Sequence, residues 1–160
     1  MSLTKMNLSA AAAAGAVLTV LHFQTRTPLK AADGQPVTIN HLGRDSAKVV
    51  AKQREQRNQG VEDARNGVPF DATAQDYRDA ELLATGMTGW HGVPQGWLIE
   101  LSQEQLDAMS AEELAALDEV VPFSTENAIT LLLNPGMNWL REQYVKSFDD
   151  RGKLLAAQEA

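Results

Sequence analysis

The fold is decided near the start of the chain by residues 17–24, which read VLTVLHFQ. β-Branched and aromatic residues are enriched in strands, so this stretch predicts a strand. Residues 36–42 read PVTINHL, and apolar and polar side chains alternate along them, which predicts a second strand. Proline and an Asp-Gly pair, both typical of turns, lie between the two. The sequence therefore predicts a β-hairpin with a long loop over residues 17–43.

Two strands alone are marginally stable in water, so we expect this hairpin to pack on helices. A helix is predicted over residues 45–66, with Asp45 or Ser46 as the cap of its free amides and a Gly at its end. Most of its residues are polar, so it cannot bury a wide apolar stripe. We interpret it as a solvated strut, as a bridge to another subunit or as a segment that is only marginally folded.

Short helices are predicted for the rest of the chain, which we describe as a helical body over residues 71–158. Start signals occur at Asp71, Ser102, Ser110 and Ser124, where a short polar side chain precedes an apolar run. Helical spacing of three and four residues predicts two apolar stripes. Their members are Ala80, Leu83, Met87 and Trp90 in the first, and Met137, Leu140, Tyr144, Phe148 and Leu155 in the second. The predicted fold class is α+β, mainly α-helical, with an N-terminal β-hairpin, a polar helix and a bundle of short helices.

The first residues predict a flexible N-terminal arm over residues 1–16, and residues 17–160 predict a single domain. Alanines 10–14 precede the apolar run 17–23. A cleaved signal peptide has the opposite order, with small residues after the apolar region. The apolar run is also too short to span a bilayer as a helix. We therefore expect a cytoplasmic protein with no membrane partner.

Composition restricts the chemistry that the chain can perform. The 160 residues include no cysteine, which excludes disulfides, a thiol nucleophile and cysteine-based zinc sites. None of His22, His41 and His91 has a second histidine three or four residues away, and a pair formed by His22 and His41 across the hairpin is the only alternative. The chain has no Gly-rich phosphate loop and no Gly-x-Ser-x-Gly turn. We expect no enzyme, no catalytic residue, no metal and no cofactor.

Charge divides the chain into two unlike halves. Lys and Arg number 14 against 21 Asp and Glu, and the formal net charge is −7. Residues 1–80 sum to +2 and residues 81–160 sum to −9, with no Lys or Arg between Arg78 and Arg141. An acidic total argues against nucleic acid as a partner. The acidic half is either an ordinary solvated face or a surface that repels other copies of the chain and attracts a basic or helical partner.

The candidate partner-binding residues combine large rings near turns with acidic side chains. Two tryptophans lie close together in residues 89–97, which read GWHGVPQGW. Packing on a small core is one interpretation of these rings, and an anchor for a partner is the other, because tryptophan is enriched at interface hot spots. The candidate set is Trp90, Trp97, Phe123, Glu112, Glu113, Asp118 and Glu119.

Four segments carry a resemblance to a known family. Residues 34–39 read GQPVTI, residues 42–46 read LGRDS, residues 89–93 read GWHGV, and residues 122–143 read PFSTENAITLLLNPGMNWLREQ. From about residue 18 to residue 148, the chain resembles the tail assembly chaperones of long-tailed bacteriophages, which are encoded between the major tail protein and the tape measure. One departure is an insertion over residues 98–121, which could instead belong to a protein that stays in the virion.

The resemblance implies a non-enzymatic viral protein that acts during virion assembly in the host cytoplasm. Such a chaperone binds the long helical tape measure protein, keeps it soluble and helps to recruit tail tube subunits. Whether the chain also forms a homo-oligomer stays open. Two other functions remain as alternatives: a structural component of the virion, in capsid or tail, and a small acidic regulatory or anti-defence protein that mimics nucleic acid.

Overall fold

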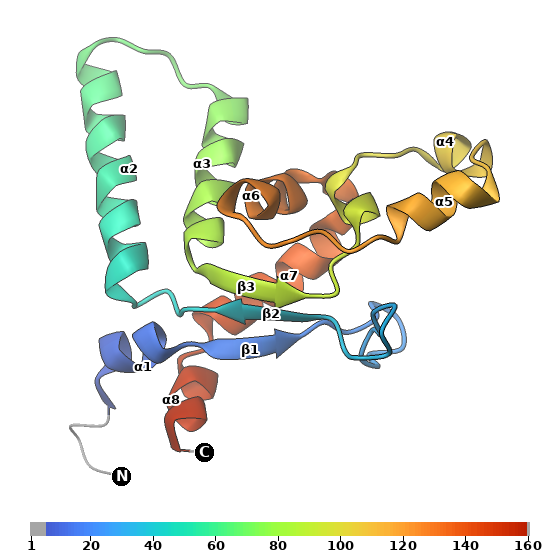
Figure 1. Cartoon of the computed structure of the whole chain (residues 1–160). Coiled ribbons are helices and arrows are strands. Elements are labelled where there is room, and N and C mark those ends of the chain that lie inside the picture. The colour runs from blue at the N-terminus through green and yellow to red at the C-terminus, as the bar shows by residue number, and fades with distance from the viewer. Residues whose placement is uncertain (1–5, 160) are drawn as a thin grey trace.

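A small antiparallel sheet organises the fold (Figure 1). The computed structural model describes residues 6–159, so the first five residues of the predicted arm lie outside the described part. The strands are β1 (Ala16–Thr19), β2 (Thr38–His41) and β3 (Met87–His91), in the order β1-β2-β3. The predicted class, α+β and mainly α-helical, is confirmed.

Helices make up most of the remaining described residues. Their bounds are α1 (Leu8–Ala14), α2 (Ala47–Arg65), α3 (Ala72–Thr85), α4 (Gln103–Asp107), α5 (Ala111–Leu117), α6 (Thr125–Leu133), α7 (Asn138–Asp149) and α8 (Arg151–Glu159). Two single turns of 3₁₀-helix are also present, η2 (Gln95–Leu98) and η3 (Pro135–Met137). Three predicted helix caps are confirmed: the side chains of Ser46, Asp71 and Ser124 each accept a backbone N–H at the start of α2, α3 and α6.

The predicted hairpin is confirmed, since β1 and β2 pair antiparallel with Leu18 opposite Ile39. The chain continues past β1 in an extended form, and there Gln143 of α7 binds both backbone groups of Leu21. The Leu21 N–H donates to Gln143 Oε1 at 2.9 Å, and Gln143 Nε2 donates to the Leu21 carbonyl at 2.7 Å. A side-chain amide thus completes the hydrogen bonding of a peptide group at this edge.

The helical stripe predicted from Ala80 to Trp90 is wrong beyond residue 85. Helix α3 ends at Thr85, and Met87 and Trp90 lie in β3, which pairs with β2. Gly86 lies at the turn between α3 and β3, where the backbone passes too close to α7 for a side chain to fit. A Cβ at this position would lie 2.5 Å from Cε2 of Phe148 and 2.9 Å from the Tyr144 hydroxyl. The region predicted as a helical body therefore contributes the third strand.

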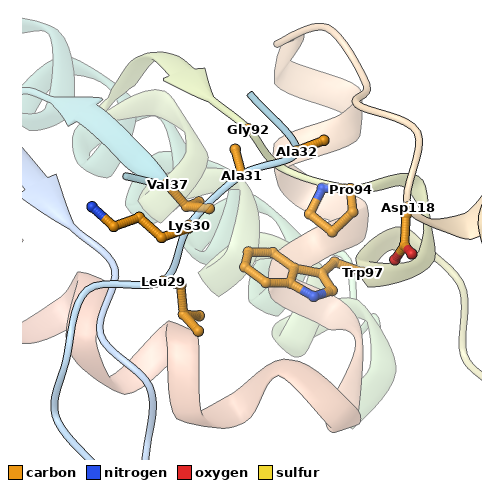
Figure 2. A pocket seen from close by; sticks show the side chains of 9 residues that line it. All are labelled: Leu29, Lys30, Ala31, Ala32, Val37, Gly92, Pro94, Trp97 and Asp118. Atoms are coloured by element: carbon orange, nitrogen blue, oxygen red, sulfur yellow. The ribbon is translucent and has the colours of Figure 1, made fainter. Parts of the chain in front are cut away.

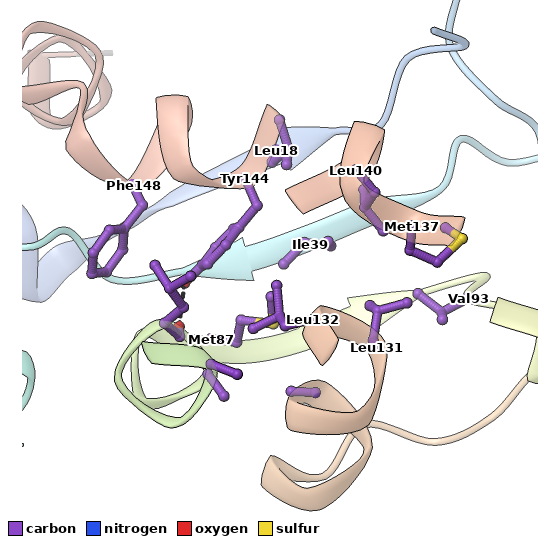
Figure 3. Close-up of a cluster of buried hydrophobic side chains, with 14 of the residues drawn as sticks. Leu18, Ile39, Met87, Val93, Leu131, Leu132, Met137, Leu140, Tyr144 and Phe148 are labelled. Atoms are coloured by element: carbon purple, nitrogen blue, oxygen red, sulfur yellow. Dashed lines mark hydrogen bonds between the residues drawn. The ribbon is translucent and has the colours of Figure 1, made fainter. Parts of the chain in front are cut away.

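The hydrophobic core lies between one face of the sheet and the helices α3, α6 and α7 (Figure 3). Leu18 and Ile39 point to this face from adjacent strands, and both are buried. Tyr144 and Phe148, one turn apart on α7, are completely buried against them. The Tyr144 hydroxyl donates to the Leu83 carbonyl at 2.7 Å, which joins α7 to α3. Val17 and Asn40 point to the opposite face of the sheet and are exposed.

The two ends of the described chain differ from the prediction. Residues 8–14, assigned to the flexible arm, form helix α1, which packs against α8 and buries Ala11 and Ala12. The predicted last helix is divided at Asp150, whose side chain accepts the Lys153 N–H and so caps a new helix. As a result Leu154 rather than Leu155 is the buried residue of α8. Asn7 caps α1 in a similar way, through a hydrogen bond from the Ala10 N–H.

Two segments project from opposite ends of the sheet (Figure 1). Helices α2 and α3 extend from the end where β2 stops and β3 begins. The other projection follows β3 and η2, and we call residues 98–121, which include α4 and α5, the acidic arm. The insertion noted in the sequence therefore forms one continuous arm.

Candidate partner-binding surface

Two of the predicted aromatic residues meet at the base of the acidic arm. The rings of Trp90 and Phe123 are 5.2 Å apart and meet edge to face. The indole N–H of Trp90 donates to the carbonyl of Val121 at 2.9 Å. Both rings are half-buried. This geometry satisfies the polar edge of the indole within the chain and favours packing over partner anchoring for the pair.

Trp97, the third predicted ring, lies close by but has a different neighbour. Its ring is 5.6 Å from that of Trp139, again edge to face. The buried side chain of Asn134 donates to the carbonyls of Trp97 at 2.9 Å and Ile99 at 3.2 Å. The same side chain accepts the Gly136 N–H at 3.1 Å. One amide therefore both begins η3 and holds the first residues of the arm.

The last residues of the arm are also fixed to the body. The Gln95 N–H donates to the Glu119 carbonyl at 2.7 Å, and the Val121 N–H donates to the Val93 carbonyl at 3.0 Å. Both ends of the arm are thus attached by backbone carbonyl contacts, whereas α4 and α5 extend away from the body (Figure 1). Such an arrangement presents a surface at a defined position.

The predicted acidic residues lie along this arm and are all exposed. Glu112 and Glu113 occupy the first turn of α5, where negative charge is stabilised by the helix dipole. Asp118 and Glu119 follow its last residue, so the four carboxylates form two pairs at opposite ends of one short helix. The start signal predicted at Ser102 is present at α4 as a capping box: the Ser102 side chain accepts the Gln105 N–H, and the Gln105 side chain accepts the Ser102 N–H. At α5, Ser110 caps the helix through the Glu113 N–H at 3.1 Å.

Apolar side chains accompany the acids on the arm, which the sequence analysis did not single out. Leu114 is 40% exposed and Val120 is 54% exposed. Only the structure shows that the arm projects from the body and leaves these two residues uncovered. An acidic surface with exposed apolar residues suits a helix that carries apolar and basic residues.

A cavity of about 320 Å³ lies beside the base of the arm (Figure 2). Trp97 and Asp118 line it from the arm side, and Leu29 and Lys30 line it from the hairpin loop. Gly92, with φ of +78°, allows that loop to approach, since a Cβ there would lie 2.5 Å from Cβ of Ala31. The lining holds one cation, Lys30, and one carboxylate, Asp118, among mostly apolar groups. Such a lining fits the binding of a partner's side chain better than the catalysis of a reaction.

His41 takes part in a buried polar chain that resembles a nucleophile and its base. Its Nδ1 lies 2.8 Å from the Leu42 carbonyl, which only accepts, so Nδ1 carries the proton and Nε2 accepts from the Ser147 hydroxyl at 2.7 Å. Lys153 Nζ donates to the same hydroxyl at 2.6 Å. His41 and Ser147 are 1% and 5% exposed, so a substrate has no access to them. The contact instead joins β2, α7 and α8.

Burial and charge shift the pKa values of this cluster. Desolvation lowers the pKa of His41, the Leu42 carbonyl opposes this change, and the nearby Lys153 charge adds to it. Burial likewise lowers the pKa of Lys153. At the hairpin loop, the Gln35 N–H and His91 lower the pKa of the exposed Asp33 carboxyl, which lies 2.7 Å from His91 Nε2.

Within residues 6–159, no three histidine or acidic side chains lie close enough together to hold a metal ion. His22 and His41 do not form the alternative pair, because His22 stacks on Phe23 and His41 binds Ser147. None of the described helices combines the length and the apolar character needed to cross a membrane.

No family of proteins matches this chain, and neither a curated protein nor a solved structure does. The functional interpretation therefore depends on the surface described above and on the sequence.

Replacement of Trp97 by Ala tests its packing role. We expect Trp97→Ala to lower the free energy of unfolding by about 2 kcal/mol, below the usual cost for a fully buried ring, because the indole is half-buried against Trp139. Urea unfolding followed by circular dichroism measures the change. Trp97→Phe is the matched control and should retain most of the stability. If Trp97→Ala leaves the urea midpoint of unfolding unchanged but abolishes binding to a partner, Trp97 is an anchor for that partner and not a packing residue.

Proposed function

We propose that the chain is a non-enzymatic assembly factor of a long-tailed bacteriophage that binds the tape measure protein and recruits tail tube subunits. In this proposal it acts in the host cytoplasm, and the acidic arm is the surface that receives the tape measure. The observation that carries the proposal is the arm itself, which projects from the body with acidic and apolar side chains exposed. The resemblance of residues 18–148 to tail assembly chaperones supports the choice of partner.

The chemistry of the arm suits a helical ligand with basic flanks. Leu114 and Val120 offer apolar contact, and the carboxylates around them attract Lys and Arg from a distance. Charge attraction of this kind is screened by salt and is reversible. A chaperone needs such reversibility, because tail tube subunits must later displace it from the tape measure.

Neutralisation of the arm tests this function. We expect the variant Glu112→Gln, Glu113→Gln, Asp118→Asn, Glu119→Gln to bind the tape measure at least about 10-fold more weakly, which corresponds to about 1.4 kcal/mol. The four side chains are exposed, so the fold should be retained. The measurement is co-purification from cells that also express the tape measure protein of the same phage, followed by titration of the purified pair.

A matched control carries Glu126→Gln and Glu142→Gln, two exposed carboxylates on the body outside the arm, and should bind as the wild type does. Equal binding by the arm variant and the wild type would contradict the role of the arm. Failure of the wild-type chain to co-purify with the tape measure would contradict the function.

One observation favours the alternative of a structural virion component. At the end of the α2–α3 projection, Phe70 is 82% exposed and Val68 is 53% exposed, as in a surface that contacts a neighbour. Mass spectrometry of purified virions separates the two functions, since an assembly factor is absent from the finished particle and a structural subunit is present.

A further inference from the structure

Helix α2 contacts the rest of the chain along one polar seam. Lys52 Nζ lies 2.5 Å from Glu81 Oε1, and Gln56 Nε2 donates to the Arg78 carbonyl at 2.8 Å. Near the end of the helix, Arg78 binds Asp63 at 2.8 Å. Lys52, Gln56 and Asp63 recur at intervals of four and seven, so they lie on one side of α2, and that side faces α3. The Lys52 pKa is raised, first of all by the hydrogen bond to Glu81.

The opposite side of α2 is basic and uncovered. Arg54, Arg57, Val61 and Arg65 follow one another at spacings of three and four, and all four are exposed. Among the residues that the structure describes, none of the three guanidinium groups has a carboxylate partner. We call these four residues the basic face of α2.

The acidic arm is the complement of this face in charge. It has no Lys or Arg, its carboxylates are exposed, and Leu114 and Val120 provide apolar contacts for a residue such as Val61. Figure 1 shows α2 and the arm at opposite ends of the sheet, on either side of the body. The two surfaces therefore cannot meet within one chain.

We propose that the basic face of α2 in one copy of this chain binds the acidic arm of a second copy. Because the two surfaces differ and lie at opposite ends, the contact is head to tail and leaves a free surface at each end of a dimer. Further copies can add until a ring closes or a filament forms. This inference does not depend on the proposed function, since both surfaces belong to the chain itself.

Nucleic acid is a less suitable ligand for the basic face. Only three cations lie on it, and α2 contains no aromatic side chain on which a base could stack. If both ligands of the arm bind at the same carboxylates, a tape measure helix and the second copy compete, so partner binding would dissociate the oligomer.

The test is the mass of the purified full-length chain as a function of salt and protein concentration. At an ionic strength of about 0.01 M, where the Debye length is about 30 Å, we expect the weight-average mass to rise with concentration to at least twice the monomer mass. At about 1 M, where this length is about 3 Å, we expect 17.4 kDa at every concentration. Sedimentation velocity measures both.

Charge reversal assigns the contact to the two surfaces. The arm variant carries Glu112→Lys and Glu113→Lys, and the α2 variant carries Arg54→Glu and Arg57→Glu. Each alone should associate more weakly than the wild type at low salt, because its two reversed side chains repel the like charges of the opposing surface. An equimolar mixture should associate again, because each variant then offers the opposite sign to the other. A control with Glu126→Lys and Glu142→Lys changes the net charge as the arm variant does and should associate as the wild type does.

Three results would overturn the proposal. The first is a wild-type chain that is monomeric at low salt and at all concentrations, including one that instead binds a labelled oligoribonucleotide. The second is association in both single-surface variants that is as strong as in the wild type. The third is failure of the mixture to associate when each variant is folded by circular dichroism. Each of these uses the chain alone, so none can be confused with a failure to bind the tape measure.

Discussion

A Phe148→Ala variant is expected to lose about 3–5 kcal/mol of its free energy of unfolding. Phe148 is completely buried, and its ring lies 5.7 Å from that of Tyr144. The side chain also fills the space left open by Gly86 and lies beneath the Arg44 guanidinium, 5.1 Å from the ring centroid. Removal of the ring therefore leaves a cavity where β3 begins and where α3 and α7 meet, and the surrounding backbone cannot close it.

This loss is large compared with the total stability of about 5–15 kcal/mol that is usual for a domain. Urea unfolding measures it, with circular dichroism as the signal. Leu155→Ala is the matched control, because Leu155 belongs to the apolar stripe predicted from the sequence but is only half-buried. We expect it to cost less than about 1.5 kcal/mol. Similar costs for the two variants would contradict the arrangement of α7 and α8.

The stability of the fold is expected to fall as the pH is lowered below about 6.5, the ordinary value for histidine. Burial lowers the pKa of His41 in the folded state, so the unfolded chain binds a proton more readily than the folded chain does. The contribution is therefore fully present above the unfolded pKa. It is lost as the pH falls towards the lower folded pKa. Protonation would place a second cation beside the Lys153 ammonium, with both directed at the Ser147 hydroxyl.

His41→Gln removes the titrating group and keeps an acceptor for Ser147. We expect this variant to lose about 1–3 kcal/mol at neutral pH, since a buried hydrogen-bonded group is replaced imperfectly. Between about pH 5 and pH 7 its stability should change less than that of the wild type. Urea unfolding at each pH measures both effects. Parallel pH profiles for the wild type and His41→Gln would refute the assignment to His41.

An element of secondary structure could be predicted from the sequence where its own residues carry a hydrophobic pattern and a capping side chain. The hairpin, α2, α3 and α6 were predicted because alternation, a capping side chain or a terminating Gly lies within a few residues of each. The polar character of α2 was also informative, since the structure shows that only Val49 is buried in it. These features depend on residues near one another in the sequence, which propensity and capping describe.

The errors arose where distant segments decide the structure. Met87 and Trp90 continue the helical spacing of α3, and a strand of five residues is too short for its own alternation to be distinguished from that spacing. Pairing with β2 determines that residues 87–91 form a strand and not a continuation of α3. The break at Asp150 is similar, because ion pairs from Arg44 to Asp149 and from Arg151 to Asp45 join residues more than a hundred positions apart.

The candidate surface was predicted in part. The acidic residues and the three large rings were named from composition and turns, but the roles of Asn134 and Trp139 were not. Nothing near Asn134 in the sequence shows that its amide reaches the carbonyls of Trp97 and Ile99. Exposure of Leu114 likewise depends on the direction in which the arm leaves the body.

The contact between Gln143 and Leu21 has a consequence for aggregation. An uncovered edge of a sheet is a template on which strands from other molecules can polymerise. Here the side-chain amide occupies the backbone donor and acceptor of Leu21, where β1 would otherwise extend at the edge of the sheet. The chain is thereby protected at this position against amyloid-like growth.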